Sequence, residues 1–409
     1  MTNLPQGWEV KKLGDIVKLK NGFAFKSNLF CDKGIPIVRI KNIQNENIIL
    51  DDLVFCNPSD YKNDLNNYLI FKNDILIAMS GATTGKIGIY NLNDKAYLNQ
   101  RIGLLRIDNS ILRKYVFWFL YCNSEQNLAN AFGAAQPNLN TEQIHNIQIP
   151  MPPLKEQERI VGILDESFAK IDESIKILEQ DLLNLDELMQ SALQKAFNPL
   201  KDKSKENYQL PQGWEWKSLG EICYITDGTH KTPQYKENGI PFLSVKNISK
   251  GFFDLSDVKY ISLEEHNKLI KRAKPKFGDI LICRIGTLGK AIKVCLEFEF
   301  SIFVSLGLLK PKISIISDYL VYFLNSHFIE IWINNNKVGQ GTHTAKLNLS
   351  VLEKCPIAIP PLKEQEQIAS YLDELSLNIK ALKENYKTQI KDYEELKKSL
   401  LKKAFEGRL

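Results

Sequence analysis

The sequence of 409 residues lacks the signals that would place it in a membrane or outside the cell. Its longest apolar run, Tyr115 to Cys122, is far shorter than the roughly 20 residues that cross a bilayer. The first residues, MTNLPQGWEV, contain no apolar signal region. The seven cysteines never form a CxxC pair, which is typical of free thiols in a reducing compartment. We therefore expect a cytoplasmic protein that makes no contact with a membrane.

Short motifs of catalysis are also missing. The five histidines show neither HExxH nor another metal-ligand spacing, and no GxSxG nucleophile elbow occurs. Asn57-Pro58 and Asn198-Pro199 both lack the second proline of a methyltransferase motif. Ser80 to Lys86 (SGATTGK) is not a phosphate-binding loop, because three residues rather than four separate its glycines and Ile87 follows the lysine. The residues give no support for a catalytic chain or for a metal site.

What the chain does contain is a long internal repeat. The matching segments are PQGWE at 5–9 and 211–215, GIPIVRIKNI at 34–43 and GIPFLSVKNI at 239–248, PPLKEQERI at 152–160 and PPLKEQEQI at 360–368, and KAF at 195–197 and 403–405. A period this long exceeds that of a solenoid repeat and indicates a duplicated domain followed by a helix. One chain therefore carries two similar surfaces, and we expect it to read its target in two parts.

The repeat and the composition divide the chain into five segments. We expect a first module over residues 1–154, a helix over 155–197, a linker over 198–209, a second module over 210–362 and a second helix over 363–409. The hydrophobic content of 44% and the charged content of 25% are ordinary for globular domains. The two modules are basic and the first helix is acidic, so a polyanion would bind the modules rather than that helix.

Each module is predicted to mix strands and helices. Short apolar runs bounded by Gly, Asn and Asp are typical of strands, and they occur at 35–40, 75–79, 87–90, 240–245, 280–283 and 291–294. A helix follows over 111–132 and over 318–337, and a short strand then precedes each proline pair. The expected fold class is therefore α+β, with two similar mixed α/β domains joined by long helices.

The helices after the proline pairs carry a heptad pattern. From Leu154 to Phe197 there is no proline, and apolar residues recur at alternating steps of four and three. These positions are Leu164, Phe168, Ile171, Ile175, Leu178, Leu182, Leu185, Met189, Ala192 and Ala196. The second helix keeps one row, Leu372, Ile379, Tyr386, Tyr393 and Leu400, whereas Ser376, Lys383 and Lys397 interrupt the other, where we expect Leu375, Leu382 and Leu396 to take over. The two-fold between the repeats predicts an antiparallel coiled coil.

Polar residues at the ends of the predicted strands are candidate DNA contacts. A strand, a Gly/Thr turn and a lysine can place backbone N–H groups and one cation on a phosphate, although a plain hairpin has the same pattern. Asparagine and glutamine can bond adenine edges and lysine can bond guanine, although an ordinary polar loop or a solvated strand end is the alternative. The candidates are Arg39, Lys41, Asn42, Thr83, Thr84, Lys86, Gln100, Arg101, Gln136, Asn138, Asn140, Lys246, Asn247, Arg284, Thr287, Lys290, Thr342, His343, Thr344 and Lys346.

Trp8 and Trp214 stand in identical PQGWE contexts. A tryptophan could stack on a base, but side chains that read different sequences should differ between the two halves. We therefore expect both tryptophans to anchor a module to the helices.

These motifs together resemble the specificity subunit of type I restriction-modification enzymes over essentially the whole chain. The residues that carry the resemblance are PQGWE at 5–9 and 211–215, IPMPPLKEQERI at 149–160, IAIPPLKEQEQI at 357–368 and LLKKAFEGRL at 400–409. The resemblance implies two target recognition domains, each of which reads one half of a gapped site in double-stranded DNA. It also implies that the helices, as an antiparallel coiled coil, fix the gap and dock two modification (methyltransferase) subunits.

The same resemblance implies that the chain is not itself an enzyme. Methyl transfer would use S-adenosylmethionine on the modification subunits, and cleavage would use ATP and Mg²⁺ on restriction subunits, so no cofactor is expected here. The turns at 81–86 and 286–290 and the loops at 136–140 and 342–346 fall where the family's recognition domains resemble those of adenine methyltransferases. The first repeat ends in KAFNPL rather than KAFEGRL, which leaves the end of the first helix near Asn198 open.

Overall fold

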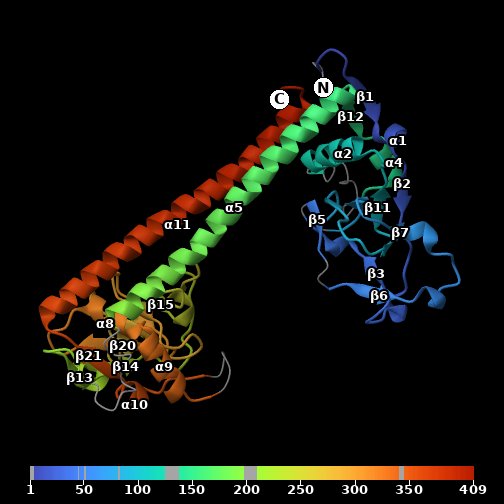
Figure 1. The fold of residues 1–409 in the computed structure, drawn as a ribbon. Coiled ribbons are helices and arrows are strands. Elements are labelled where there is room, and N and C mark those ends of the chain that lie inside the picture. The colour runs from blue at the N-terminus through green and yellow to red at the C-terminus, as the bar shows by residue number, and fades with distance from the viewer. Residues whose placement is uncertain are drawn as a thin grey trace. The chain divides into compact units, whose positions relative to one another are not determined.

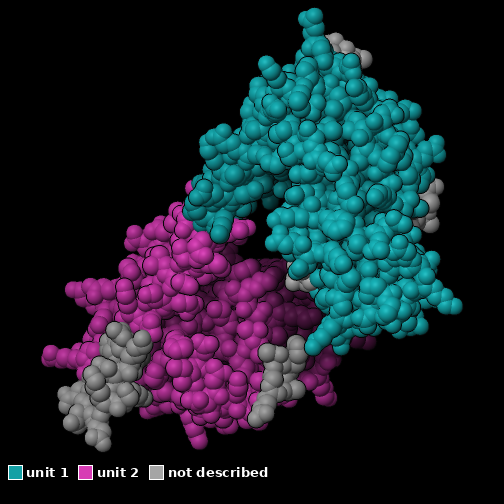
Figure 2. Space-filling model, turned by 45° about the vertical axis from the view of Figure 1, so that its right-hand side comes forward, with its two compact units in different colours: residues 1–178, 388–409 teal, residues 179–387 magenta. Residues whose placement is uncertain are grey.

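The computed structural model describes residues 4–44, 46–49, 52–81, 83–124, 138–197, 210–339 and 345–409. The chain forms two compact units, which Figure 2 shows in different colours. One comprises residues 1–178 and 388–409, and the other comprises residues 179–387. Each unit holds one globular module together with part of both long helices. The helix expected over 111–132 ends earlier, at Cys122. The expected linker, residues 125–132, and the candidates Gln136, Thr342, His343 and Thr344 lie outside the described residues.

In the first unit, mixed sheets and short helices build the module (Figure 1). One sheet has the strand order β2-β11-β8-β9-β5-β4, another has the order β6-β3-β10-β7, and β1 pairs with β12. The strands are β1 Glu9–Lys12, β2 Leu19–Asn21, β3 Ile35–Val38, β4 Ile43–Gln44, β5 Glu46–Ile48, β6 Val54–Cys56, β7 Leu69–Ile70, β8 Ile75–Ala78, β9 Ile87–Ile89, β10 Ala96–Leu98, β11 Ile102–Leu105 and β12 Gln148–Met151. The α-helices are α1 Leu13–Ile16, α2 Ser110–Cys122 and α4 Thr141–His145, followed by the long α5 Leu154–Ala196.

The second unit repeats this plan with a smaller sheet. One sheet has the order β14-β20-β17-β18, another has the order β16-β15-β19, and β13 pairs with β21. The strands are β13 Glu215–Ser218, β14 Cys223–Asp227, β15 Ile240–Leu243, β16 Lys259–Ile261, β17 Ile280–Cys283, β18 Ala291–Lys293, β19 Ser301–Ile302, β20 Leu306–Pro311 and β21 Pro356–Ile359. The α-helices are α6 Leu219–Ile222, α7 Leu263–Leu269, α8 Ser317–Leu324, α9 His327–Asn336 and α10 Leu349–Leu352, followed by the long α11 Leu362–Phe405.

The central strands are those that the apolar runs predicted. Every residue of β8 (ILIA) and of β17 (ILIC) is buried, because both faces of each strand are covered. On one side β8 pairs with β9 and on the other with β11, and β17 pairs in the same way with β18 and β20. The strand runs predicted at 35–40, 75–79, 87–90 and their repeats are thus confirmed, and the observed strands are shorter by at most two residues.

The single helix expected over 318–337 is wrong, because the structure has two helices there. α8 ends at Leu324 and α9 begins at His327. The Asn325 amide bonds both Ala291 N and Ala291 O, which holds this residue against the end of β18. The next residue, Ser326, caps α9 by accepting a hydrogen bond from Ile329 N. A side-chain cap and a bond to a neighbouring strand therefore interrupt the apolar pattern.

The PQGWE motifs lead into strands that close each module. β1 pairs with β12 and β13 pairs with β21, so the start and the end of each module are joined in one antiparallel ladder. Trp214 is buried, and its Nε1 donates to the Glu364 carboxylate in the first turn of α11 at 3.1 Å. Trp8 packs against the core of the first unit, beside Gly407, which follows α11. These contacts agree with the anchoring role that the repeated context predicted.

The long helices pair antiparallel within each unit. In the first unit, Asp172 of α5 forms an ion pair with Lys397 of α11. In the second unit, Asp186 of α5 pairs with Lys383 of α11, so a later residue of one helix meets an earlier residue of the other. The seam residues Leu164, Ile171, Leu178, Leu185, Leu372 and Ile379 are all buried, and Tyr386, Tyr393 and Leu400 are half-buried. The helices thus form the antiparallel coiled coil that the heptad pattern predicted.

One detail of the seam was predicted wrongly. Leu375 packs against the core of the second unit as expected, but Leu382 and Leu396 are 40% and 44% exposed and do not replace the interrupted row. The lysines themselves occupy the seam, with side chains that are only 25% exposed at Lys383 and 14% exposed at Lys397. A lysine stem can bury its methylenes while its ammonium reaches an acid on the partner helix. Lys397 also lies over the Phe168 ring, with Nζ 5.1 Å from the ring centre.

Each helix ends by placing a phenylalanine in a core. Phe405 of α11 packs edge-to-face against Tyr115 and Phe119 of α2, in the first unit. In the second unit Phe197, directly after α5, packs in the same way against Tyr319 and Phe323 of α8. The repeated KAF motif is therefore a core anchor. Among the described residues, no helix is long and apolar enough to cross a membrane.

Candidate DNA interface

A glycine turn follows the central strand in each module. Gly81 and Gly85 bracket the turn between β8 and β9, and Gly286 and Gly289 bracket the turn between β17 and β18. All four have φ between 81° and 84°, a left-handed conformation that side-chain-bearing residues rarely adopt. In the first module the turn is closed by bonds from Thr84 N to Gly81 O and from Gly85 N to Ala78 O. Both turns thus begin and end with a left-handed glycine, and the second turn is one residue shorter than the first.

Three of the predicted segments meet at the end of the central strand. In the first module, Met79 N donates to Arg101 O at 3.0 Å, and Leu139 N donates to Met79 O at 2.8 Å. The residue after β8 is therefore held between the 100–101 segment on one side and the 138–140 segment on the other. The glycine turn follows directly, so residues distant in sequence form one edge.

The second module builds this edge with the same backbone bonds. Arg284 N donates to Ser305 O at 2.8 Å, and Leu347 N donates to Arg284 O at 2.9 Å. Lys346 bridges to Ile285, as Asn138 bridges to Ser80 in the first module. Equivalent positions in the two edges therefore carry different side chains on a shared backbone frame.

Solvent reaches only some of the predicted residues. Exposed side chains are Lys41, Gln100, Arg101, Asn138, Asn140, Lys246, Thr287 and Lys346, and half-buried ones are Arg39, Thr83, Lys86 and Lys290. Two of the exposed residues also have internal roles. Asn140 caps α4 by accepting from Gln143 N, and Lys41 forms an ion pair that lowers the pKa of the Asp52 carboxyl. The remaining described candidates are buried.

The buried candidates have structural roles rather than the DNA contact that the sequence suggested. Asn42 and Asn247 are 1% and 4% exposed, and each accepts from the backbone N–H three residues earlier, at Arg39 and Ser244. The Asn42 amide also donates to Ile49 O, and the Asn247 amide donates to Asp254 O. Thr84 is 3% exposed and its hydroxyl donates to Gly81 O within the turn. Small polar side chains that bond nearby backbone shape these turns.

Arg284 is the fourth buried candidate, and its polar groups bond internal partners. Its Nη1 pairs with the Asp227 carboxylate at the end of β14, and its Nε donates to Leu347 O at 3.0 Å. Burial raises the pKa of the Asp227 carboxyl, but hydrogen bonds from Arg272 and Arg284 outweigh it and hold the pKa below its usual value. Asp227 is thus charged at neutral pH, and Arg284 ties it to the 346–348 segment.

Two exposed residues at this carboxylate, Arg272 and His230, were not among the candidates. Arg272, after α7, bonds Asp227 through its guanidinium, and His230 Nε2 lies 3.1 Å from the same carboxylate. Their side chains are 54% and 64% exposed. The partners are far apart in sequence, so no local motif indicates the cluster. The available signal was the contrast between TDG at 226–228 and KNG at 20–22 in the repeats.

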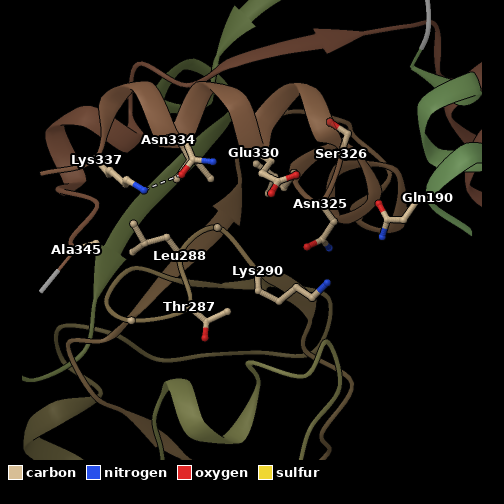
Figure 3. Close-up of a pocket in the computed structure, with 14 residues that line it drawn as sticks. Gln190, Thr287, Leu288, Lys290, Asn325, Ser326, Glu330, Asn334, Lys337 and Ala345 are labelled. Carbon is tan, nitrogen blue, oxygen red and sulfur yellow. Dashed lines mark hydrogen bonds between the residues drawn. The ribbon is translucent and has the colours of Figure 1, made fainter. Parts of the chain in front are cut away.

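A groove runs along the second turn, between it and α9. Its volume is about 520 Å³. Figure 3 shows Thr287, Leu288 and Lys290 along the turn, with Asn334 and Lys337 on the facing helical segment. Lys337 Nζ donates to Asn334 Oδ1 at 2.8 Å. A side chain at Gly289 would lie 2.3 Å from Ile333, so the glycine also allows the turn to pack closely on α9.

Comparison with known proteins gives one consistent answer. The family described as "Type I restriction modification DNA specificity domain" matches residues 5–182 and 211–392. The EcoBI specificity subunit of Escherichia coli is 24% identical, covering 100% of this chain and 88% of that protein. The StySPI specificity subunit of Salmonella potsdam is 26% identical, covering 99% of this chain and 90% of that protein.

Solved structures show the same fold. The HsdS subunit from Thermoanaerobacter tengcongensis superposes with a TM-score of 0.60 at 22% identity, covering 100% of this chain and 98% of that one. A chain from a type I R-M system superposes with a TM-score of 0.76, also at 22% identity, with full coverage of both chains. The two family matches coincide with the two repeats, and each match contains one of the two edges described above. The chain therefore belongs to the family of type I restriction modification DNA specificity domains, and it carries two copies of that domain.

Proposed function

We propose that this chain is the DNA specificity subunit of a type I restriction-modification complex and performs no catalysis itself. Each module binds one half of a bipartite site in double-stranded DNA. The observation that carries this proposal is the pair of edges at the ends of β8 and β17. The two edges share backbone bonds but present Asn138 in one module and Lys346 in the other. A shared frame with different side chains suits two modules that read different sequences.

The helices provide the surface for partner subunits. Apolar side chains on α11 remain exposed within the second unit, at 58% for Tyr371 and 68% for Leu377. Exposed apolar side chains on this helix are available for contact with a partner protein. We propose that two modification subunits dock, one for each repeat, because the repeated sequences offer two similar sites. Restriction subunits join this complex in the cytoplasm.

The chemistry resides on those partners in this proposal. S-adenosylmethionine binds the modification subunits, and ATP and Mg²⁺ bind the restriction subunits. The sequence supports this division because it contains no catalytic motif. Purified chain without partners is therefore expected to bind none of the three in calorimetry. Stoichiometric binding of S-adenosylmethionine by the isolated chain would favour a fused methyltransferase instead.

The decisive test is the methylation pattern of DNA. The chain is expressed with its modification subunit, and the methylated sites are mapped in the presence and absence of the chain. We expect a gapped motif of two unlike halves that disappears without the chain. An Asn138→Ala variant should relax one half, and a Lys346→Ala variant should relax the other. If each variant altered both halves, independent reading by the modules would be wrong, and a pattern that ignores the chain would contradict the function.

A further inference from the structure

We propose that Arg272 reads a guanine in the half-site bound by the second module, with Asp227 as its positioning residue. This inference rests on the proposed function and assigns one specificity determinant within it. Arg272 lies after α7, in a segment without a repeat motif. Its role follows from how its guanidinium is held.

Asp227 holds one edge of the guanidinium. Arg272 Nε donates to Asp227 O at 3.2 Å, and Nη2 pairs with Asp227 Oδ1. Within the part of the chain that the structure describes, Arg272 Nη1 has no hydrogen-bond partner, and the side chain is 54% exposed. The Nε–Nη2 edge is thus occupied while the Nη1–Nη2 edge remains. Two parallel N–H groups on that edge match the O6 and N7 acceptors of guanine in the major groove.

The positioning carboxylate is itself rigidly placed. The Asp227 side chain is 2% exposed, and Arg284 pairs with its second oxygen from the buried side. The backbone next to it is equally constrained, since a Cβ at Gly228 would lie 2.0 Å from Ile302 O. A fixed carboxylate restricts the rotamers of Arg272 before DNA arrives, which lowers the entropy lost on binding.

The same bonds connect Arg272 to the DNA-facing edge. Arg284 links Asp227 to Leu347 through Nε and to Val304 O through Nη1. Lys346 and the turn at 286–290 lie on this edge, so Arg272 belongs to one surface with them. The cluster of Arg272, Arg284 and one Asp227 carries net positive charge, which favours a polyanion.

The first module lacks this device. Asn21 occupies the position of Asp227, as the pairing of Asn21 with Gly103 and of Asp227 with Gly307 shows. The Asn21 amide bonds Thr141 instead. A guanine read by Arg272 should therefore appear only in the half-site of the second module.

The test uses the complex with its modification subunit and a library of duplexes randomised in both half-sites. We expect Arg272→Ala to lose roughly 10- to 100-fold of the preference for guanine at one position of the second half-site. Arg272→Lys should keep part of it, because an ammonium can still donate to guanine but cannot form the fork. Arg272→Gln should shift the preference at that position toward adenine. Lys271→Ala, a neighbouring exposed cation, is the matched control and should keep the wild-type pattern.

The outcomes separate the alternatives. Unchanged preference for the first half-site in each variant shows that the chain is folded and bound. If Arg272→Ala weakened binding equally for all sequences and Arg272→Lys restored it, Arg272 would contact a phosphate, and the inference would be overturned. The inference would also be overturned if the guanine preference survived in all three Arg272 variants. A wild-type complex with no two-part preference would instead overturn the proposed function.

Discussion

The two modules fill matching strand ends with opposite chemistry. In the first module, Phe23 follows β2 and packs against Phe25 at 5.0 Å and Tyr68 at 5.1 Å between ring centres. In the second, Thr229 takes the equivalent place, since Phe23 pairs with Asn99 as Thr229 pairs with Phe303. Two residues before Thr229, the Asp227 carboxylate pairs with Arg272 and Arg284. One loop is held by aromatic packing and the other by the ion pairs of the buried Asp227 carboxylate.

The difference shows which features the fold requires and which it leaves free. The close approach of Gly22 to Asn99 O is matched by that of Gly228 to Ile302 O, where a Cβ would lie 2.1 Å and 2.0 Å away. The backbone bonds at Met79 and Arg284 are also the same. Backbone hydrogen bonds and glycines therefore define the edge, and side chains of either kind can stabilise it. That freedom lets the two halves diverge toward different targets.

The largest expected effect is the loss of the Asp227 ion pairs in the second module, which leaves the aromatic packing of the first module unchanged. Asp227→Ala leaves the buried Arg284 without its counter-charge, which costs about 3–5 kcal/mol in a buried pair. Asn21→Ala removes an exposed bond to Thr141 and should cost less than about 1 kcal/mol. Hydrogen exchange resolved by peptide measures both, at β17 and at β8. Equal losses from the two variants would contradict the view that only the second loop depends on charge.

The next effect tests whether the units are stabilised separately. Phe405→Ala removes a ring from the core of the first unit, and Phe197→Ala removes the matching ring from the second. Each should cost about 3 kcal/mol, at the low end for a buried phenylalanine because a helix end can shift into the space. Proteolysis of the intact chain should then open only the unit that lost its ring. Opening of both units by either variant would show that they unfold together.

Much of the fold could be predicted because its elements follow periodic or repeated patterns of residues in the sequence. The apolar runs specify β8 and β17, and the heptads specify α5 and α11, since burial on a regular element leaves a regular pattern. The break between α8 and α9 was missed because it depends on the bond between Asn325 and Ala291 of another element. The lysines in the seam were missed because their acidic partners lie on the other helix, at Asp172 and Asp186.

The candidate site was predicted less completely. The glycine turns and the loops at 136–140 and 342–346 could be proposed because repeats and turn residues are local signals. Asn42, Asn247, Thr84 and Arg284 were chosen for residue type, although their polar groups are used inside the fold. Arg272 was missed because its partner, Asp227, is brought to it only by the tertiary fold. Which of the exposed candidates contact DNA stays a prediction.

A smaller effect distinguishes a seam that contains Lys397 from one that contains Leu396. Lys397→Ala should cost about 1–2 kcal/mol, because it removes a buried stem, a cation over Phe168 and a partner of Asp172. Leu396→Ala should cost about 0.5 kcal/mol, since Leu396 is 44% exposed. Urea unfolding followed by peptide-resolved exchange in the first unit measures both. A greater loss from Leu396→Ala would restore the seam that the sequence alone suggested.

The smallest effect is a pH dependence confined to the second unit. The pKa of Asp227 is lower in the folded protein than its value of about 3.9 in an unfolded chain. Its stabilisation is therefore complete above about pH 4 and is lost as the pH falls through the folded pKa. Asp227→Asn removes this dependence, so wild type and variant should run parallel between pH 7 and 5 and converge below pH 4. The difference in slope can reach about 1.4 kcal/mol per pH unit for one carboxyl. Exchange of β17 peptides across this range measures it, and peptides of β8 serve as the internal control. Parallel curves throughout would mean that the arginines do not hold the Asp227 proton affinity down.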